Sequence, residues 1–315
     1  MLVELLQKQS GLPLSVIMHI ADTASKRYKT YPIPKRSGGT REISHPSRGV
    51  KAIQRWISKV LLRRLAVHEA ATAYSKGSSI KRNAERHLKS HYTLRLDFEN
   101  FFPSFESAGI SEFLNNQNLL RELELSEQDI KFVSKIVTRY DRLTIGAPSS
   151  PILTNAMMYE FDDDLSTICL ERNLIYTRYA DDIFISAFRP DSLNEILPFV
   201  GDLIQKQKFV DLKISEKKTA QLSRKYRRSI TGLVVTPDQR ISIGRARKRM
   251  VKSLVFRFAN GDLSVPEIVQ LCGLIAFVRD VDRHFLDSLV LKYGSDILER
   301  LQRPYLATEK SSEVD

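Results

Sequence analysis

The chain has 315 residues, of which 42% are hydrophobic and 27% charged, an ordinary composition for a globular protein with a sizeable core. No apolar run approaches the roughly 20 residues that span a bilayer, and two isolated cysteines, Cys169 and Cys272, exclude a disulfide framework or thiolate metal cluster. The apolar stretch near the N-terminus lacks a basic leader, so we expect a cytoplasmic protein with no membrane partner.

The net charge of +12 is concentrated in one part of the chain. Residues 204–258 contain 16 Lys and Arg against three acidic residues, so the remainder is close to neutral. A basic block that interleaves apolar residues is typical of a surface that binds a polyanion such as nucleic acid. The alternative is a solvated lysine-rich face without a partner.

The N-terminal part begins with a short helix-like segment. Residues 31–46 follow, and their pattern predicts two strands joined by a glycine turn. Residues 50–68 place Val50, Ile53 and Ile57 at helical spacing. Cations recur every fourth position along another side of this helix, at Lys51, Arg55, Lys59 and Arg63. Such a stripe usually faces solvent, but in a nucleic-acid enzyme it would face phosphates.

The middle of the chain alternates strand and helix patterns, and its end is helical. We expect strands over 91–102 and 229–235, a hairpin over 175–187, and helices over 148–173 and 193–207. Beyond residue 239, apolar residues at helical spacing predict further helices. A sheet that contains a hairpin, with helices on one side, indicates an α+β fold.

Three acidic residues adjoin apolar strands. Asp97 follows Leu94 and Leu96 in alternation, so its side chain should point to the face opposite the leucines. Asp181 and Asp182 lie between two apolar arms, without the Asn-Gly or Asp-Gly step that favours a tight hairpin. Paired acids in a turn are often only solvated. A charge at the end of an apolar strand, however, needs water, a partner or a metal.

If these strands are neighbours, the three carboxylates converge on one face of the sheet. Two Mg²⁺ ions would relieve their repulsion, and such a pair supports phosphoryl transfer. Because successive strand residues face opposite sides, we expect Asp97 and Asp181 to be the main ligands and Asp182 to support them. The acidic run at 161–165 lies within a helical pattern and is expected to be a solvated face.

The sequence resembles reverse transcriptases at three motifs in the expected order: Asp97 in LDFENFF, GAPSSPILTN at 146–155, and YADD at 179–182. NAERH at 83–87 and ITGLVV at 230–235 resemble two elements of the bacterial retron branch, the second with isoleucine in place of valine. The resemblance implies a right-hand polymerase architecture. Its parts would be fingers over 1–92, a palm over 93–238 with a finger-side insertion around 106–145, and a helical thumb over 239–315.

The resemblance also implies how the acidic residues act. Asp97, Asp181 and Asp182, together with the backbone carbonyl of Phe98, would hold two Mg²⁺ ions, for which Mn²⁺ could substitute. The reaction would be nucleotidyl transfer from deoxynucleoside triphosphates on an RNA template.

Further residues are implied in handling the nucleotide. Lys218, or equally Lys217, would protonate the departing pyrophosphate. Phe102 would exclude a ribose 2′-hydroxyl by its size, with simple core packing as the alternative. The residues implied in binding the nucleotide are Lys35, Arg41, Phe102, Gly146, Ala147 and Pro148. The family usually has Gln before Gly146, where this chain has Ile145, so one polar contact to the nucleotide is missing or comes from elsewhere.

Resemblance to the retron branch implies a cognate structured noncoding RNA as template, primed from the 2′-hydroxyl of a guanosine within it. The product would be branched multicopy single-stranded DNA, with a host ribonuclease H removing template. A role in antiphage defence with a separately encoded effector protein is implied as well. The implied RNA-binding residues are Asn83, His87, Thr231, Gly232, Arg245, Arg247, Lys248, Arg249 and Lys252. For Asn83 and His87, a polar helix edge without RNA is an equal alternative.

Other functions remain open at this point. Another bacterial reverse transcriptase, of the intron or abortive-infection type, is the nearest alternative, although no long extension follows the expected thumb. A catalytically silent RNA-binding protein with a palm fold would not need the complete set of acidic residues. A nucleotide cyclase would not explain the NAERH and ITGLVV elements.

Overall fold

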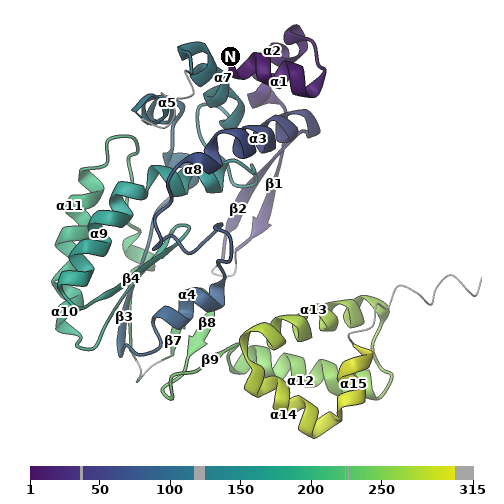
Figure 1. The fold of residues 1–315 in the computed structure, drawn as a ribbon. Helices are drawn as coiled ribbons and strands as arrows, with labels where there is room; N and C mark the ends of the chain where they lie inside the picture. The colour runs from purple at the N-terminus through teal and green to yellow at the C-terminus, as the bar shows by residue number, and fades with distance from the viewer. Residues whose placement is uncertain (36–37, 117–124, 224, 226, 302–315) are drawn as a thin grey trace, which may run out of the picture. The chain divides into compact units, whose positions relative to one another are not determined.

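The computed structural model describes residues 1–35, 38–116, 125–223, 225 and 227–301 (Figure 1). The chain forms two compact units, one of residues 1–79 and 91–221 and one of residues 80–90 and 222–315. The segment 80–90 therefore packs with the C-terminal part of the chain. The division into fingers, palm and thumb concerns function and remains a prediction.

The main sheet has the strand order β4-β5-β3-β6. Its strands are β3 (Tyr92–Asp97), β4 (Ile175–Tyr179), β5 (Asp182–Ala187) and β6 (Ala220–Ser223). Strands β4 and β5 form the predicted hairpin, and β3 pairs antiparallel with β5. Alternation in β3 puts Leu94 and Leu96 on one face, where they join Ile183 and Ile185 in the core.

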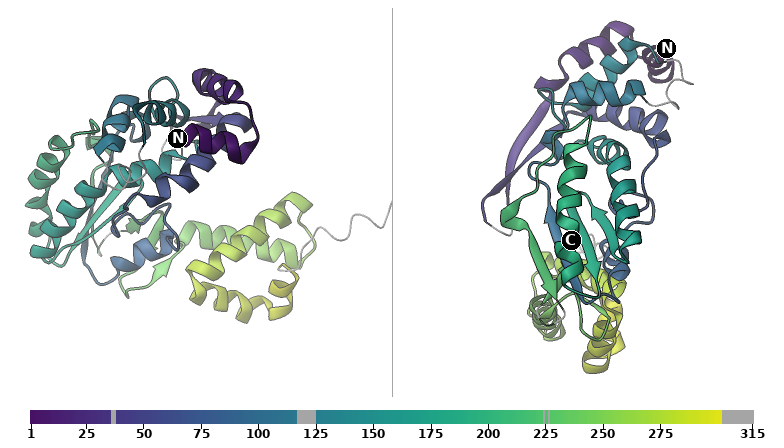
Figure 2. Two further views of the ribbon diagram at one scale, coloured as in Figure 1. Left: turned by 45° about the horizontal axis from the view of Figure 1, so that its top comes forward. Right: turned by 90° about the vertical axis from the view of Figure 1, so that its left-hand side faces the viewer.

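Helices pack on this apolar face of the sheet (Figures 1 and 2). They are α8 (Ser150–Met157), α9 (Tyr159–Glu171), α10 (Asp191–Asn194) and α11 (Ile196–Gln205). The regions 148–173 and 193–207, each predicted as one helix, both contain two. Met158 and Glu195 separate the members of each pair.

The rest of the first unit is mostly helical. Its elements are α1 (Leu2–Ser10), α2 (Leu14–Asp22), β1 (Tyr28–Pro34), β2 (Thr40–Pro46), α3 (Arg48–Val60), α5 (Ser107–Asn116) and α7 (Glu127–Val137). Strands β1 and β2 are the predicted antiparallel hairpin. Helix α3 ends at Val60, earlier than predicted, and a short 3₁₀ turn follows at Leu62–Arg64.

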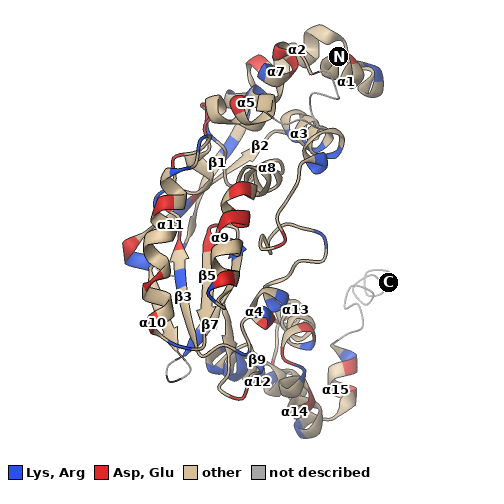
Figure 3. Ribbon diagram, turned by 60° about the vertical axis from the view of Figure 1, so that its left-hand side comes forward, with Lys and Arg blue, Asp and Glu red and all other residues tan. Residues whose placement is uncertain are grey.

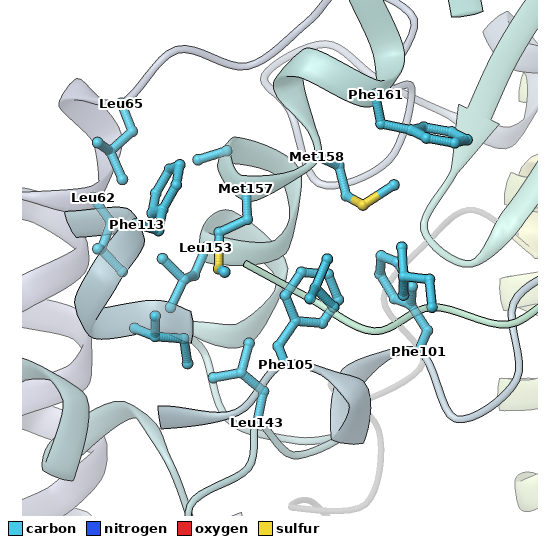
Figure 4. Close-up of a cluster of buried hydrophobic side chains, with 14 of the residues drawn as sticks. Leu62, Leu65, Phe101, Phe105, Phe113, Leu143, Leu153, Met157, Met158 and Phe161 are labelled. Atoms are coloured by element: carbon cyan, nitrogen blue, oxygen red, sulfur yellow. The ribbon is translucent and has the colours of Figure 1, made fainter. Parts of the chain in front are cut away.

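The core next to Asp97 is aromatic. Phe98 stacks on Phe101 with ring centroids 5.5 Å apart, and Phe101 meets Phe105 edge to face at 5.1 Å. Figure 4 shows Phe101 and Phe105 beside side chains of α8 and α9. Offset and edge-to-face ring pairs contribute beyond their buried area, so this cluster holds the end of β3 firmly.

The acidic run at 161–165 differs from its prediction as a solvated face. Asp163 and Asp164 are exposed, but Asp162 is completely buried and forms an ion pair with the equally buried Arg178 of β4, Oδ2 to Nη2 2.6 Å. The prediction was wrong for Asp162 because helical spacing does not reveal a cationic partner on another element.

The second unit combines a small sheet with helices. Its elements are α4 (Ile80–Arg86), β7 (Arg228–Ile230), β8 (Leu233–Val235), β9 (Ile241–Ser242), α12 (Arg245–Ala259), α13 (Val265–Val281), α14 (Arg283–Tyr293) and α15 (Ser295–Arg300). The single strand predicted over 229–235 is instead a hairpin. Thr231 and Gly232 turn the chain with φ of 47° and 78°.

The predicted α+β class is confirmed by this mixture of antiparallel sheets and helices. In the described part of the chain, no helix combines the length and apolar character that crossing a membrane requires.

Candidate active site

Strand register brings the three acidic residues together. Asp97, the last residue of β3, lies directly opposite Asp182, the first residue of β5. Residues directly opposite in an antiparallel pair project from the same face. The amide of Phe98 donates a hydrogen bond to the carbonyl of Asp181 at 3.0 Å. The register therefore places Asp97 and Asp182 on one face of the sheet, with Asp181 in the adjoining turn. The roles of the three carboxylates, and the convergence of all three on one face, remain predictions.

The turn that carries Asp181 is strained. Tyr179 pairs with Asp182, so Ala180 and Asp181 alone connect β4 to β5. Ala180 has a left-handed backbone with φ of 57°, which costs a residue with a side chain about 1–2 kcal/mol. The strain arises from the Ala180 side chain, because a Gly at this position would adopt the same φ without strain.

The carboxylates repel one another. Burial, followed by the charges of Asp181 and Asp97, raises the pKa of Asp182 to about 7. Burial also raises the pKa of Asp181, with the charge of Asp97 adding to the effect. The carboxyls of Asp181 and Asp182 thus resist ionisation in the metal-free protein. A hard divalent cation binds carboxylate oxygens, and its charge would favour the ionised forms of both groups. Among the described residues, however, no three His, Cys, Asp or Glu side chains form a ready-made metal site.

A lysine meets the third carboxylate. The Nζ atom of Lys218 lies 2.5 Å from Oδ1 of Asp97, so its ammonium group compensates the charge of Asp97. Lys217 is exposed on the same short 3₁₀ turn, Glu216–Lys218. The geometry thus favours Lys218 over Lys217, two residues that sequence alone did not separate.

A cavity of about 500 Å³ joins these groups to the β1–β2 hairpin. Lys35 and Arg41 of the hairpin line it together with Phe102, Asp181 and Lys218. The structure therefore brings three of the predicted nucleotide-binding residues to the wall of one cavity with part of the acidic cluster. Its mixture of cations, a carboxylate and an aromatic ring suits a ligand with both phosphates and an apolar body.

The loop that starts at Gly146, in the motif GAPSSPILTN, packs against β2. Its Gly146 has φ of 116°, and a Cβ at this position would lie 2.8 Å from the carbonyl oxygen of Ser44. Ala147 is buried, and the carbonyl of Ile145 accepts a hydrogen bond from the amide of Ser44 at 2.8 Å. Ile145 itself lines the cavity. Gly146 therefore permits close packing against β2, whereas Gly146, Ala147 and Pro148, which were expected to bind the nucleotide, are not among the residues that line the cavity.

Two exposed tyrosines that the sequence analysis missed also line the cavity. Tyr74 and Tyr140 have left-handed backbones, with φ of 62° and 47°, and such strain is concentrated at functional sites. Partial desolvation of the phenol at the cavity wall, then the charge of Asp181, raises the pKa of Tyr74. Neither residue belongs to a periodic pattern, so only a backbone angle distinguishes it.

The acidic cluster makes the stability of the metal-free protein depend on pH. The folded chain binds the Asp182 proton more tightly than the unfolded chain, because the pKa is about 7 instead of 3.8. Stability should therefore fall as the pH rises from about 4 to about 7, and level off above that. The cations of Arg95 and Lys218 reduce this effect without reversing it.

Thermal denaturation in chelator between pH 4 and 8 measures this dependence. Asp182→Asn should flatten the curve and raise the midpoint at pH 8. Asp164→Asn, a change at an exposed position of α9, should leave the wild-type curve unchanged. A wild-type midpoint that does not fall across this range, or an equal effect of both variants, would contradict the assignment.

In the second unit, the NAERH and ITGLVV elements interlock. The hydroxyl of Thr231 donates to the carbonyl of Ile80 at 2.9 Å, at the start of α4. The buried guanidinium of Arg228 donates to the carbonyls of Ser90 and His87 at the other end of the helix. The turn Thr231–Gly232 thus anchors α4, and its backbone lies at the surface of the unit.

Asn83 and His87, which the sequence analysis expected to bind RNA, are completely buried. Burial, reinforced by the charge of Arg228, lowers the pKa of His87 to about 3, so its ring is neutral at physiological pH. Side chains without solvent access cannot touch RNA. The prediction that Asn83 and His87 contact RNA directly is therefore wrong, and both residues pack inside the unit. The sequence pattern could not separate these readings, because both require a polar edge.

The basic residues of α12 fall into two groups, and Figure 3 shows the Lys and Arg positions along this helix. Arg245, Arg249 and Lys252 are exposed. Lys248 instead forms an ion pair with the buried Asp282, Nζ to Oδ2 2.9 Å, and Arg247 donates to the carbonyl of Gly232 at 3.4 Å. Lys248 thus helps to hold α12 against the start of α14, and RNA contact by Lys248 and Arg247 remains a prediction.

Comparison with known proteins agrees with this geometry. Residues 33–249 match a sequence family described as reverse transcriptase (RNA-dependent DNA polymerase). The chain is 35% identical over 287 residues to the retron Ec83 reverse transcriptase of Escherichia coli, covering 88% of this chain and 90% of that protein. It is 28% identical over 307 residues to the retron Ec86 reverse transcriptase of Escherichia coli, covering 94% and 91%.

A solved structure supports the fold separately. Apo telomerase from Candida tropicalis matches with a TM-score of 0.51 and 13% identity, over 87% of this chain and 57% of that one. The chain thus spans just over half of the telomerase chain, and the likeness concerns the fold alone.

Proposed function

The chain belongs to the retron reverse transcriptases and is an RNA-directed DNA polymerase, and on this premise we propose that it copies a cognate structured noncoding RNA into branched multicopy single-stranded DNA. Synthesis starts from the 2′-hydroxyl of a guanosine in that RNA. One observation carries the proposal at the level of chemistry: Asp97 and Asp182 at strand ends and Asp181 in the turn lie beside a cavity that Lys35 and Arg41 line.

Asp97, Asp181 and Asp182 are the groups that would hold two Mg²⁺ ions, with the carbonyl of Phe98 as a further ligand and Mn²⁺ as a substitute. The raised pKa values of Asp181 and Asp182 support this assignment, because divalent charge would offset their repulsion. When bound, a pair of such ions stabilises the attacking and leaving oxygens of a phosphoryl transfer.

The remaining cavity residues act on the nucleotide. Lys35 and Arg41 bind the triphosphate through charge-assisted hydrogen bonds. Phe102 presents its ring to C2′ of the sugar and excludes a 2′-hydroxyl by size. Lys218, now paired with Asp97, donates a proton to the departing pyrophosphate. With Ile145 on the wall, the base and sugar meet an apolar surface where the family usually places an amide.

RNA is held by the second unit. Arg245, Arg249 and Lys252 of α12 contact phosphates, and the backbone of the Thr231–Gly232 turn adds recognition of RNA shape. The high density of cations in residues 204–258 supports this assignment. The protein acts in the cytoplasm, where a host ribonuclease H removes template and a separately encoded effector links the product to antiphage defence.

Priming on the cognate RNA tests the proposed function. The DNA just upstream of the gene should encode a noncoding RNA with paired inverted repeats. Purified protein, this transcript and deoxynucleotides should yield DNA without any added primer, and debranching enzyme should release that DNA from the RNA. A transcript whose candidate guanosine carries a 2′-deoxy substitution serves as the matched control.

The outcomes separate the competing reaction types. DNA synthesis only from an added primer, on any template, would indicate an intron-type or abortive-infection enzyme instead. Binding of the transcript without synthesis, under Mg²⁺ or Mn²⁺, would indicate a silent RNA-binding protein.

A further inference from the structure

A buried ion pair lies directly beneath the strained turn. Arg178 of β4 and Asp162 of α9 have no solvent exposure. The guanidinium donates from Nε to Oδ1 at 2.8 Å and from Nη2 to Oδ2 at 2.6 Å, and the Tyr176 hydroxyl donates to the same Oδ1 at 2.6 Å. This two-point geometry restrains both position and orientation of the guanidinium plane.

The third nitrogen of Arg178 reaches the turn. Its Nη1 donates to the carbonyl of Ala180 at 3.1 Å and to Oδ1 of Asn155 at 3.3 Å. Ala180 is the left-handed residue immediately before Asp181. The carbonyl that Arg178 holds therefore belongs to the peptide unit that joins Ala180 to Asp181, so the position of this bond and of the Asp181 Cα are coupled.

Asn155 extends the network to a second segment of the cavity wall. Its Nδ2 donates to the carbonyl of Ala73 at 2.9 Å, and Tyr74, which lines the cavity, is the next residue. The amide of Thr72 donates to the carbonyl of Arg178 at 2.8 Å. Arg178 and Asn155 thus hold two backbone segments of the cavity wall, one just before Asp181 and one just before Tyr74.

Stability alone does not explain this arrangement. A buried ion pair is often no more stable than well-packed apolar side chains of similar volume, because both charges lose their hydration. What apolar residues cannot supply is a directed donor to the Ala180 carbonyl. The pair of Arg178 and Asp162 is therefore expected to fix the position of the Ala180–Asp181 turn as well as to fill space in the core.

We propose that Arg178 is a positioning residue of the polymerase, which sets the place of the Asp181 carboxylate relative to Asp97 through the Ala180 carbonyl. Asp162 orients the guanidinium, and Asn155 connects Arg178 by hydrogen bonds to the segment that carries Tyr74. The inference rests on the proposed roles of Asp97 and Asp181, and the geometry that carries it is independent of the RNA.

The test exchanges the ion pair for apolar groups without leaving the Tyr176 hydroxyl unpaired. The triple variant D162L/Y176F/R178M does this, and D22L/K135M makes the same type of exchange at the exposed pair of Lys135 and Asp22, Nζ to Oδ1 2.7 Å. For each variant we would measure the thermal midpoint, the RNA affinity, and kcat and KM for deoxynucleotide. Calorimetry would give the Mn²⁺ affinity, and NMR would give the hydrogen exchange rate of the Phe98 amide.

The triple variant should fold and bind RNA as the wild type does, but lose about a hundredfold in kcat, since a displacement near 1 Å has that effect. Its KM should change little, Mn²⁺ should bind more weakly, and the Phe98 amide, which donates to the Asp181 carbonyl, should exchange faster. D22L/K135M should match the wild type in every measurement.

Wild-type kcat and Phe98 exchange in a folded triple variant would overturn the proposal, as would a lower kcat with unchanged Phe98 exchange and Mn²⁺ affinity. If the triple variant does not fold, R178K replaces it, because Lys keeps the charge but cannot hold Asp162 and Ala180 together. Wild-type kcat in folded R178K would then overturn it. If the wild type makes no DNA, the proposed function fails, while Mn²⁺ binding and Phe98 exchange still decide the positioning role.

Discussion

Asp181→Asn should reduce RNA-templated DNA synthesis by about three orders of magnitude or more, corresponding to roughly 4 kcal/mol of transition-state stabilisation. Asp181 lines the cavity with Arg41 and Lys218, and its backbone is fixed to β3 through the Phe98 amide. A neutral amide at this position keeps the shape of the side chain but loses the charge that a divalent cation requires.

The loss should not come from unfolding. Asp181 is a buried carboxyl whose pKa is raised by burial and by Asp97, so removal of its charge relieves repulsion in the metal-free protein. The thermal midpoint at pH 8 should equal or exceed that of the wild type. Primer extension under Mg²⁺ and under Mn²⁺, with Asp164→Asn as control, measures the activity. Synthesis at wild-type rate by Asp181→Asn would refute the metal-site assignment.

Phe102→Ala should allow the enzyme to use ribonucleotides. The ring lines the cavity with Asp181 and Lys218, and in the proposed function it excludes a 2′-hydroxyl by size. The ratio of kcat/KM for deoxynucleotide over ribonucleotide should fall about a hundredfold, because a purely steric exclusion disappears with the ring. Competition between dGTP and GTP in single-nucleotide extension on an RNA template measures this ratio.

A change in packing would give a different result. Phe102 contacts Phe101 edge to face at 5.5 Å, so Phe102→Ala can also loosen the aromatic core and slow both substrates together. Phe102→Tyr retains the ring and should retain the selectivity. Equal losses for dGTP and GTP in Phe102→Ala, with no change in their ratio, would show that Phe102 is a core residue only.

Local patterns in the sequence located most of the elements and the residues of the acidic cluster, but not where long helices break or where the strand over 229–235 turns. Alternation around Asp97 predicted which face of β3 the carboxylate occupies, because a strand has a period of two and its leucines must be buried. Helical spacing beyond residue 239 predicted further helices, and the first of them, α12, buries Val251, Leu254, Val255 and Phe258 on one face. Both patterns arise from neighbouring residues, and both reflect the burial of apolar side chains, which is the main driving force of folding.

Partners distant in sequence were decided only by the tertiary structure. Lys218 is 121 residues from Asp97, and its choice over Lys217 depends on where a loop meets the end of β3. Asp162 is buried because Arg178 pairs with it from β4, and Asn83 and His87 are buried because α4 packs on β7 and β8. Periodicity identifies the face that a residue occupies, but only packing determines what covers that face. A polar side chain is therefore the least predictable kind, since its burial depends on a matching partner elsewhere in the chain.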